Sequence, residues 1–359
     1  MLNSFLKNRK ILAVLIALIL LISCSSSDGD SNNDAGILPS NLTVTTEIAG
    51  KSIENPKGDG SGIVKFNINA TNATSYKISF GDGNVQNFTS GIIDYTYKTS
   101  GTYSYLVTIT ALNGSNAIST TVTITLSVAV APVWSDEFNV NGTPNSSKWG
   151  FDIGTGDGGW GNNESQYYTN RRDNVIVENG VLKIITKKED FQGSNYTSAR
   201  LLTKGKYSLK YGKVEIRAKL PAGGGTWPAL WMLGDNIGTV GWPACGEIDI
   251  MEHTGNKLNK ILGTLHYSGR SGGNADSSSK IISNATSEFH IYSIEWRADF
   301  INFYIDNQLF KNFKNTTSLP FNQNFFLIMN CAMGGGLGGA IDSNFISSTF
   351  EIDYVRVYN

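Results

Sequence analysis

Residues 247–252, Glu-Ile-Asp-Ile-Met-Glu, place three carboxylates in one short stretch that otherwise has the composition of a β-strand. Because side chains alternate between the faces of a strand, Glu247 and Asp249 share one face, and strict alternation would turn Glu252 toward the core. An unpaired carboxylate there is very costly. A one-residue bulge at Ile250–Met251 resets the alternation. We therefore predict a bulged strand that turns all three acids the same way, an arrangement that favours chemistry over stability.

Composition narrows the class of protein. The chain has 359 residues, enough for two domains, and its net charge of −1 gives no electrostatic support for nucleic-acid binding. It contains 39 glycines and abundant Ser, Thr and Asn, and few segments after residue 25 have a helical pattern. This composition predicts an all-β protein with many turns.

The N-terminal segment, residues 1–23, has the pattern of a signal peptide. Basic residues precede an apolar run at 11–22 that is too short to span a bilayer comfortably. The run ends Leu-Ile-Ser-Cys at Cys24, which resembles a bacterial lipobox and implies that Cys24 is acylated. An ordinary signal peptide that happens to carry a cysteine is the alternative. We expect an exported bacterial lipoprotein at the outer membrane and cell surface, with residues 24–40 as a flexible tether.

Residues 41–130 have the pattern of a small β-sandwich. Thr and Ser alternate with aliphatic residues over 121–128, as in a strand with one buried face. The segment 79–83, Ser-Phe-Gly-Asp-Gly, with Gly101-Thr102-Tyr103, resembles the immunoglobulin-like domain of the polycystic-kidney-disease type. That family's usual Trp-Asp pair is replaced here by Ile78-Ser79. This module has no tryptophan, so we expect a spacer rather than a glycan-binding domain.

Residues 131–359 have the pattern of one larger β-domain. Aliphatic residues alternate with charged ones over 213–220, which predicts a half-buried strand. Glycine-rich runs at 223–225, 272–279 and 334–339 are predicted to be loops around a site. Short antiparallel strands over this length predict a two-sheet β-sandwich jelly roll, in which a concave sheet provides a cleft.

The segment Gly241–Glu252 looks like the signature of glycoside hydrolase family 16, in its laminarinase branch. Supporting segments occur in family order at 134–138, 159–164, 196–200, 227–231 and 352–358. The resemblance implies an endo-β-1,3-glucanase that retains anomeric configuration, with Glu247 as nucleophile, Glu252 as general acid/base and Asp249 in support. A retaining mechanism needs two carboxyl groups about 5–5.5 Å apart, one ionised and one protonated.

The same resemblance implies residues that contact the sugar. Sugar rings present C–H faces that stack on aromatic rings, and their hydroxyls need polar partners. We expect at least Trp227 and Trp242 to line the cleft, and His266 to lie near the leaving-group side. The complete implied set is Asn162, Arg200, Trp227, Trp231, Trp242 and His266.

The sequence also gives predictions about bound metals and about the state of the cysteines. The three histidines have no zinc-binding spacing, and we expect no catalytic cofactor. The resemblance implies a structural calcium held by Glu137, the Gly180 carbonyl and Asp353. The alternative is that Asp353 forms an ion pair. Outside the signal segment the cysteines are Cys245 and Cys331, for which we favour buried free thiols over a disulfide.

The sequence is compatible with three functions. The first is hydrolysis of a laminarin-type β-glucan by a monomer that is attached to the membrane through Cys24. The second changes the substrate to mixed-linkage β-glucan or a marine galactan within the same family. The third is a surface glycan-binding lipoprotein without turnover, although a binding protein gains nothing from clustered carboxylates.

Overall fold

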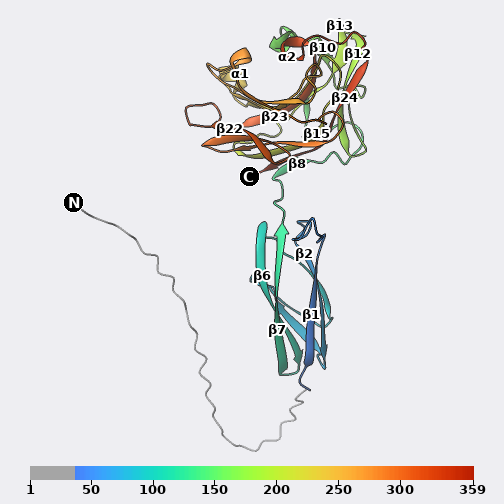
Figure 1. Cartoon of the computed structure of the whole chain (residues 1–359), viewed down its shortest axis with the longest axis vertical. Coiled ribbons are helices and arrows are strands. Elements are labelled where there is room, and N and C mark those ends of the chain that lie inside the picture. The colour runs from blue at the N-terminus through green and yellow to red at the C-terminus, as the bar shows by residue number, and fades with distance from the viewer. Residues whose placement is uncertain (1–36) are drawn as a thin grey trace, which may run out of the picture. The chain divides into compact units, whose positions relative to one another are not determined.

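The computed structural model describes residues 37–359, which form two compact units divided between Ala129 and Val130 (Figure 1). The sequence predicts this division one residue later. The predicted signal peptide, Cys24 and most of the predicted tether lie outside the described residues. Within residues 37–359, no helix has both the length and the apolar character that crossing a membrane requires.

The N-terminal unit is a sandwich of two antiparallel sheets around one core. A three-stranded sheet has the order β1-β2-β5, and a four-stranded sheet has the order β4-β3-β6-β7. The alternation predicted over 121–128 is confirmed, because Ile124 and Leu126 are buried while Thr123 and Thr125 are exposed. The strands are β1 Ser40–Ile48, β2 Ile63–Thr71, β3 Ser75–Ser79, β4 Val85–Phe88, β5 Ile92–Thr96, β6 Gly101–Asn113 and β7 Asn116–Val128.

Gly81 shows why the glycine-rich turn after β3 is needed. Its φ of 80° is one that side chains rarely adopt, and a Cβ there would lie 2.7 Å from the carbonyl oxygen of Leu106. The turn is closed by Asp82, whose carboxylate accepts hydrogen bonds from the Asn84 N–H at 3.0 Å and the Tyr95 hydroxyl at 2.6 Å. These contacts give the turn a structural role within this unit.

The C-terminal unit consists of a ten-stranded and a seven-stranded sheet (Figure 1). The path of the larger is β10-β13-β12-β24-β15-β20-β21-β22, with β11 beside β12 and β8 beside β24. The smaller has the order β19-β18-β17-β16-β23-β14-β9. Its strands are β9 Gly150–Asp152, β14 Arg200–Leu202, β16 Thr226–Gly234, β17 Glu247–Glu252, β18 Lys260–His266, β19 Asp276–Ile281 and β23 Phe325–Met333.

The main core of this unit draws buried side chains from both sheets. Val214 and Ile216 contribute from the larger sheet, and Leu230 and Ile248 from the smaller. The remaining strands are β8 Trp134–Asp136, β10 Gln166–Tyr168, β11 Val175–Glu178, β12 Val181–Phe191, β13 Ser194–Ser198, β15 Gly212–Lys219, β20 His290–Trp296, β21 Phe300–Ile305, β22 Gln308–Lys314 and β24 Ser347–Tyr358. Short helical turns are η1 Gly159–Asn163, α1 Ile237–Val240, η2 Gly272–Asn274 and α2 Gly335–Gly338.

Two predicted loops are partly regular structure. The run at 272–279 was predicted to be a loop, but it becomes the edge strand β19 from Asp276 onward, which pairs with β18. The physical reason is that the backbone groups along the edge of β18 need hydrogen-bond partners, and an extended serine-rich segment provides them. Within the third glycine-rich run, Gly335–Gly338 forms α2.

Candidate active site

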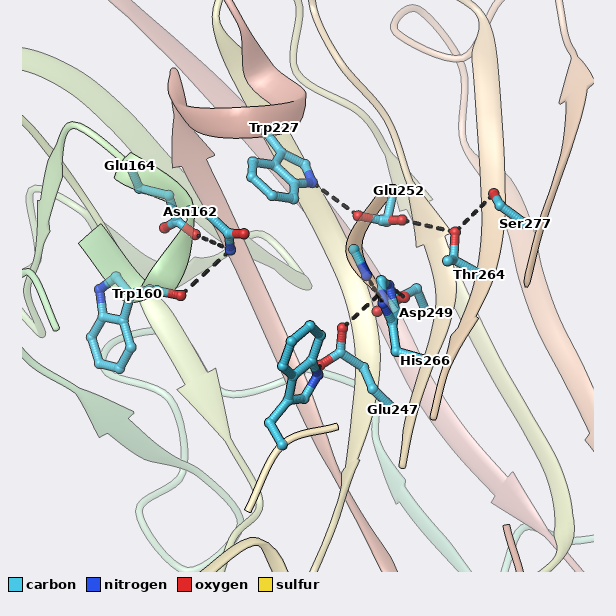
Figure 2. Close-up of polar contacts among 12 residues, drawn as sticks. Trp160, Asn162, Glu164, Trp227, Glu247, Asp249, Glu252, Thr264, His266 and Ser277 are labelled. Carbon is cyan, nitrogen blue, oxygen red and sulfur yellow. Dashed lines mark hydrogen bonds and ion pairs between the residues drawn. The ribbon is translucent and has the colours of Figure 1, made fainter. Parts of the chain in front are cut away.

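The bulge in β17 orients the three acids. Asp249 pairs with Trp231 of β16, and Glu252 pairs with Ala229, so three steps along β17 correspond to two along β16. The pairing of β17 with β18 shifts over the same interval. Ile250 and Met251 are both buried in the core. The predicted bulge is therefore confirmed, and Figure 2 shows the three carboxylates together on one side of the strand.

Register places other side chains on the same side of the sheet. Residues directly opposite each other on adjacent strands point to the same face. Trp231 and Thr264 flank Asp249, while Leu233 and His266 flank Glu247. Arg200 joins this face through its pairing with Asn330, which in turn pairs with Ala229. We call this side the site face, defined by Arg200, Trp227, Trp231, Glu247, Asp249, Glu252, Thr264, His266 and Asn330.

Glu247 lies between two nitrogen-containing rings. The indole N–H of Trp242, a residue that is 49% exposed, donates to Glu247 Oε2 at 3.1 Å. His266 Nε2 lies 3.6 Å from Glu247 Oε1 and 3.2 Å from Asp249 Oδ2. His266 Nδ1 accepts a hydrogen bond from the Gly272 N–H at 3.2 Å. We therefore assign the proton of the neutral ring to Nε2, where it faces the two carboxylates.

Glu252 is the more enclosed of the two glutamates, with 8% of its surface exposed. The Trp227 indole N–H donates to Glu252 Oε1 at 3.2 Å. On its other oxygen, Glu252 Oε2 accepts from the Thr264 hydroxyl at 3.0 Å. These two donors come from β16 and β18, the strands on either side of β17, so both carboxylate oxygens are held by the sheet itself (Figure 2).

Burial is the main cause of the raised pKa values of the three carboxyl groups in β17. Burial, reinforced by the neighbouring carboxylates, raises the pKa of Glu247 and of Asp249 well above their ordinary values. Burial also raises the pKa of Glu252, and its hydrogen bond from Thr264 opposes that rise. Because neighbouring carboxylates titrate together, the cluster holds a proton to higher pH than isolated carboxyl groups do. It can therefore present one ionised carboxylate and one carboxylic acid at the same time.

A second group on the site face is centred on Arg200. Its guanidinium lies between two indole rings, 4.4 Å from the ring centre of Trp160 and 4.9 Å from that of Trp231. Arg200 Nε lies 3.0 Å from Asp152 Oδ2. The Trp231 indole N–H donates to Asn330 Oδ1 at 2.7 Å. The ion pair and the two ring contacts thus hold Arg200, and the hydrogen bond to Asn330 holds Trp231, before any ligand arrives.

Asn162 lies in η1, which approaches the site face from outside the sheet (Figure 2). Its amide donates to Glu164 Oε1 at 3.2 Å. Glu164 Oε2 accepts from Gln166 Nε2 at 2.7 Å and from the Tyr168 hydroxyl at 3.2 Å. Trp160 in the same turn has a φ of 56°, an unfavourable backbone conformation that is typical of functional sites. Through Gln166 and Tyr168, Glu164 thus connects this turn to β10 of the ten-stranded sheet.

Sequence reasoning did not single out Trp160, Thr264 or Asn330 as members of the site. Trp160 was within the quoted segment 159–164, and Thr264 stands two residues before His266, so period-2 alternation could have placed Thr264 on the same face. Asn330 lies in β23, every residue of which is buried. No local pattern distinguishes this asparagine, because only the cross-strand register brings it beside Trp231.

The residues implied for calcium binding are engaged elsewhere. Glu137 holds Arg356 through both carboxylate oxygens, at 3.0 and 2.8 Å, and this contact lowers the pKa of Glu137. Asp353 forms an ion pair with Arg217, which is the alternative considered from the sequence. Gly180 lies in the turn between β11 and β12. With both carboxylates paired with arginines, this arrangement leaves neither of them free to bind calcium.

The two cysteines of the C-terminal unit and two of its histidines lie away from the site face. Cys245 and Cys331 are buried and unpaired. His253 follows Glu252 but is fully buried, and neither ring nitrogen has a hydrogen-bond partner among the described residues. Burial lowers the pKa of His253 to about 4, so its ring is neutral at ordinary pH. His290 is also largely buried, and its Nδ1 lies 2.7 Å from Asp306 Oδ2.

Comparison with known proteins connects this geometry to a family. The model of glycosyl hydrolases family 16 matches residues 162–356. A beta-glucanase of Rhodothermus marinus is 44% identical over 242 residues, covering 63% of this chain and 84% of its own.

Two solved structures share the fold of the C-terminal unit. The laminarinase of Rhodothermus marinus is 44% identical with a TM-score of 0.61, covering 64% of this chain and 97% of its own. A serine variant of LamA from Z. galactanivorans, in complex with laminaritriose and laminaritetraose, is 42% identical with a TM-score of 0.59, covering 64% of this chain and 99% of its own. The predicted all-β jelly roll is confirmed, and the chain belongs to the glycosyl hydrolases family 16.

Proposed function

We propose that the C-terminal unit is a retaining endo-β-1,3-glucanase that hydrolyses laminarin-type β-glucans. The observation that carries this proposal is the bulge in β17, which turns Glu247 and Glu252 to one face of the sheet. Each of these glutamates also accepts a hydrogen bond from an indole N–H, so both are oriented before substrate binds. Family membership and the names of the laminarinase relatives support the same reaction.

Within this proposal, each acid has the task that the family resemblance implies. Glu247, which faces the N–H groups of Trp242 and His266, is the carboxylate that attacks the anomeric carbon. Glu252 holds the proton and gives it to the oxygen of the leaving sugar. In the second half of the reaction Glu252 takes a proton from water, and that water displaces Glu247 from the sugar. Asp249, 3.2 Å from His266 Nε2, keeps the cluster's pKa high and its geometry fixed.

Aromatic and polar groups near the acids support a polysaccharide substrate. Trp242 provides an exposed indole beside Glu247, while Trp160, Trp231 and Arg200 form a preassembled group farther across the sheet. Sugar C–H faces stack on such rings, and sugar hydroxyls bind to such polar groups. A chain that contacts both groups must span several sugar units, which favours internal cleavage.

We further propose that the protein acts at the cell surface as a lipoprotein acylated at Cys24, with the N-terminal unit as a spacer of the polycystic-kidney-disease type. The support is the lipobox-like sequence before Cys24 and the absence of tryptophan from residues 41–130. Globomycin treatment with metabolic palmitate labelling tests this part, because Cys24→Ser should abolish the label. A structural calcium at Glu137, Gly180 and Asp353 stays a prediction, which would require both carboxylates to leave their arginines.

Release of reducing sugar tests the main proposal. The wild-type protein should release sugar from laminarin, and Glu247→Gln should reduce the rate by at least about 10³-fold, since a missing nucleophile removes the covalent route. Glu178→Gln is the matched control, because Glu178 is an exposed partner of Lys183 in the same unit. Proton NMR of fresh product should show the β-anomer first. Initial α-anomer, or binding of laminarin without release by the wild type, would contradict the proposal.

A further inference from the structure

A row of hydroxyl groups leads from Glu252 to the edge of the seven-stranded sheet. Thr264 Oγ1 donates to Glu252 Oε2 at 3.0 Å and lies 3.0 Å from Ser277 Oγ (Figure 2). Thr264 is 5% exposed, whereas Ser277 is exposed on the edge strand β19. The row therefore begins at a buried carboxyl group and ends at a side chain that water can reach.

Strand register builds this row. Thr264 pairs with Asp249 on one side and with Ser277 on the other, so the two hydroxyls project from the same face of adjacent strands. Glu252 pairs with Leu262, which makes it the diagonal neighbour of Thr264. The contact thus depends on the same bulge that turns Glu252 outward from the core.

The two hydrogen-bond partners of Glu252, Trp227 and Thr264, differ in whether they can accept as well as donate. An indole N–H is a donor only, so the oxygen that faces Trp227, Oε1, is an acceptor in both charge states of Glu252. A threonine hydroxyl can accept from a protonated Oε2 and donate to an ionised one. Either member of the Thr264–Ser277 pair can be the donor, so the whole row can reverse its direction.

We propose that Thr264 and Ser277 are positioning residues that satisfy Oε2 of Glu252 in both charge states and hold its carboxyl group in place beside the substrate. The inference rests on the proposed function, in which Glu252 acts first as an acid and then as a base. No covalent bond to Thr264 forms or breaks: the Glu252 carboxyl group gives its proton to the oxygen of the departing sugar and regains one from the attacking water. The hydrogen bond from Thr264 to Oε2 holds the carboxyl group through both steps.

The charged groups around Glu252 stay in place in the variants that test this idea. They are Glu247 and Asp249 on its own strand and His266 on β18. Because the hydrogen bond from Thr264 stabilises the ionised form, loss of the hydroxyl should raise the pKa of Glu252. The basic limb of the pH–rate profile, which reports loss of the acid's proton, should move to higher pH.

The experiment compares Thr264→Val with Thr264→Ser in the full-length protein. Substrates are laminarin, whose leaving sugar needs protonation, and an aryl β-glycoside of laminaribiose with an acidic phenol, which does not. On laminarin, Thr264→Val should lower kcat/KM by about 10–100-fold, within the range that general acid catalysis supplies. On the aryl glycoside its loss should stay below about 3-fold, and Thr264→Ser should regain most of the activity.

Ser277→Ala provides a second variant at an exposed position, with Ser279→Ala on the same strand as its control. Ser277→Ala should lower kcat/KM on laminarin by about 3–10-fold, and Ser279→Ala should match the wild type. If Thr264→Val fails to fold by near-ultraviolet circular dichroism, the comparison of these two serine variants decides the question.

Several results would overturn the inference. They are an unchanged pH profile and kcat/KM in Thr264→Val, equal losses in the Val and Ser variants, or equal losses on both substrates. A wild type that releases no sugar from laminarin would instead overturn the proposed function, and the inference with it. An active wild type with unaffected variants overturns the inference alone.

Discussion

Asp249→Asn should make the protein more stable at neutral pH while it impairs catalysis. Asp249 is 4% exposed, and its pKa is raised well above the ordinary value by burial and by Glu252. In the unfolded chain this carboxyl ionises freely, so folding at neutral pH requires either a buried charge or an added proton. An asparagine of the same shape requires neither, and its amide can donate to Glu247.

The geometry gives the size of the effect. The facing atoms of Glu247, Asp249 and His266 all lie within 4.8 Å of one another. Two like charges at that separation repel by about 3.5 kcal/mol at an effective dielectric constant of about 20. The His266 Nε2–H and sharing of a proton offset part of this repulsion. We therefore expect Asp249→Asn to raise the free energy of unfolding by about 1–3 kcal/mol at pH 8.

The sign of the pH dependence follows from linkage. A carboxyl group whose folded pKa is raised contributes most to stability below its unfolded pKa of about 3.9, and that contribution is lost as the pH rises through the folded pKa. The advantage of Asp249→Asn should therefore be small at pH 4 and increase toward pH 8. Activity on laminarin should fall in the same variant, a trade-off typical of active sites.

Tryptophan fluorescence during urea unfolding at pH 4, 6 and 8 measures this effect. All seven tryptophans lie between residues 134 and 296, so the signal reports on the C-terminal unit alone. Asp353→Asn is the matched control, because Asp353 is paired with Arg217 and its loss should leave stability unchanged or slightly lower. If Asp249→Asn is less stable than the wild type at pH 8, or its advantage does not depend on pH, the electrostatic reasoning is wrong.

Two other residues give predictions of stability. Met251→Ala should lower the free energy of unfolding by about 2–5 kcal/mol, because Met251 is fully buried in the core beneath the bulge; urea unfolding measures this loss, and a change below about 1 kcal/mol would contradict it. His253→Leu should make the free energy of unfolding depend less on pH in the acid range. A buried histidine whose pKa is lowered from 6.5 to about 4 costs the wild type up to about 3 kcal/mol as the pH falls through that interval; parallel curves for both proteins would exclude this role.

The prediction from sequence was most successful where a local rule applied. The bulge in β17 follows from the conflict between Glu252 and strict alternation, and neighbouring strands confirm it. The order of motifs along residues 133–359 indicated the family, which the comparisons confirm. The edge strand β19 was missed because serines have little intrinsic preference for a strand, and its pairing depends on the open edge of β18.

The sequence by itself determined that three carboxylates share one face of the strand, because alternation and the cost of a buried carboxylate act over a few neighbouring positions. The tertiary structure decided what surrounds them. Trp227 and Thr264 reach Glu252 from two different strands, and Asn330 reaches Trp231 from a third. Such contacts arise from the register between strands that are distant in the chain, and side-chain pattern within one strand does not specify its partner.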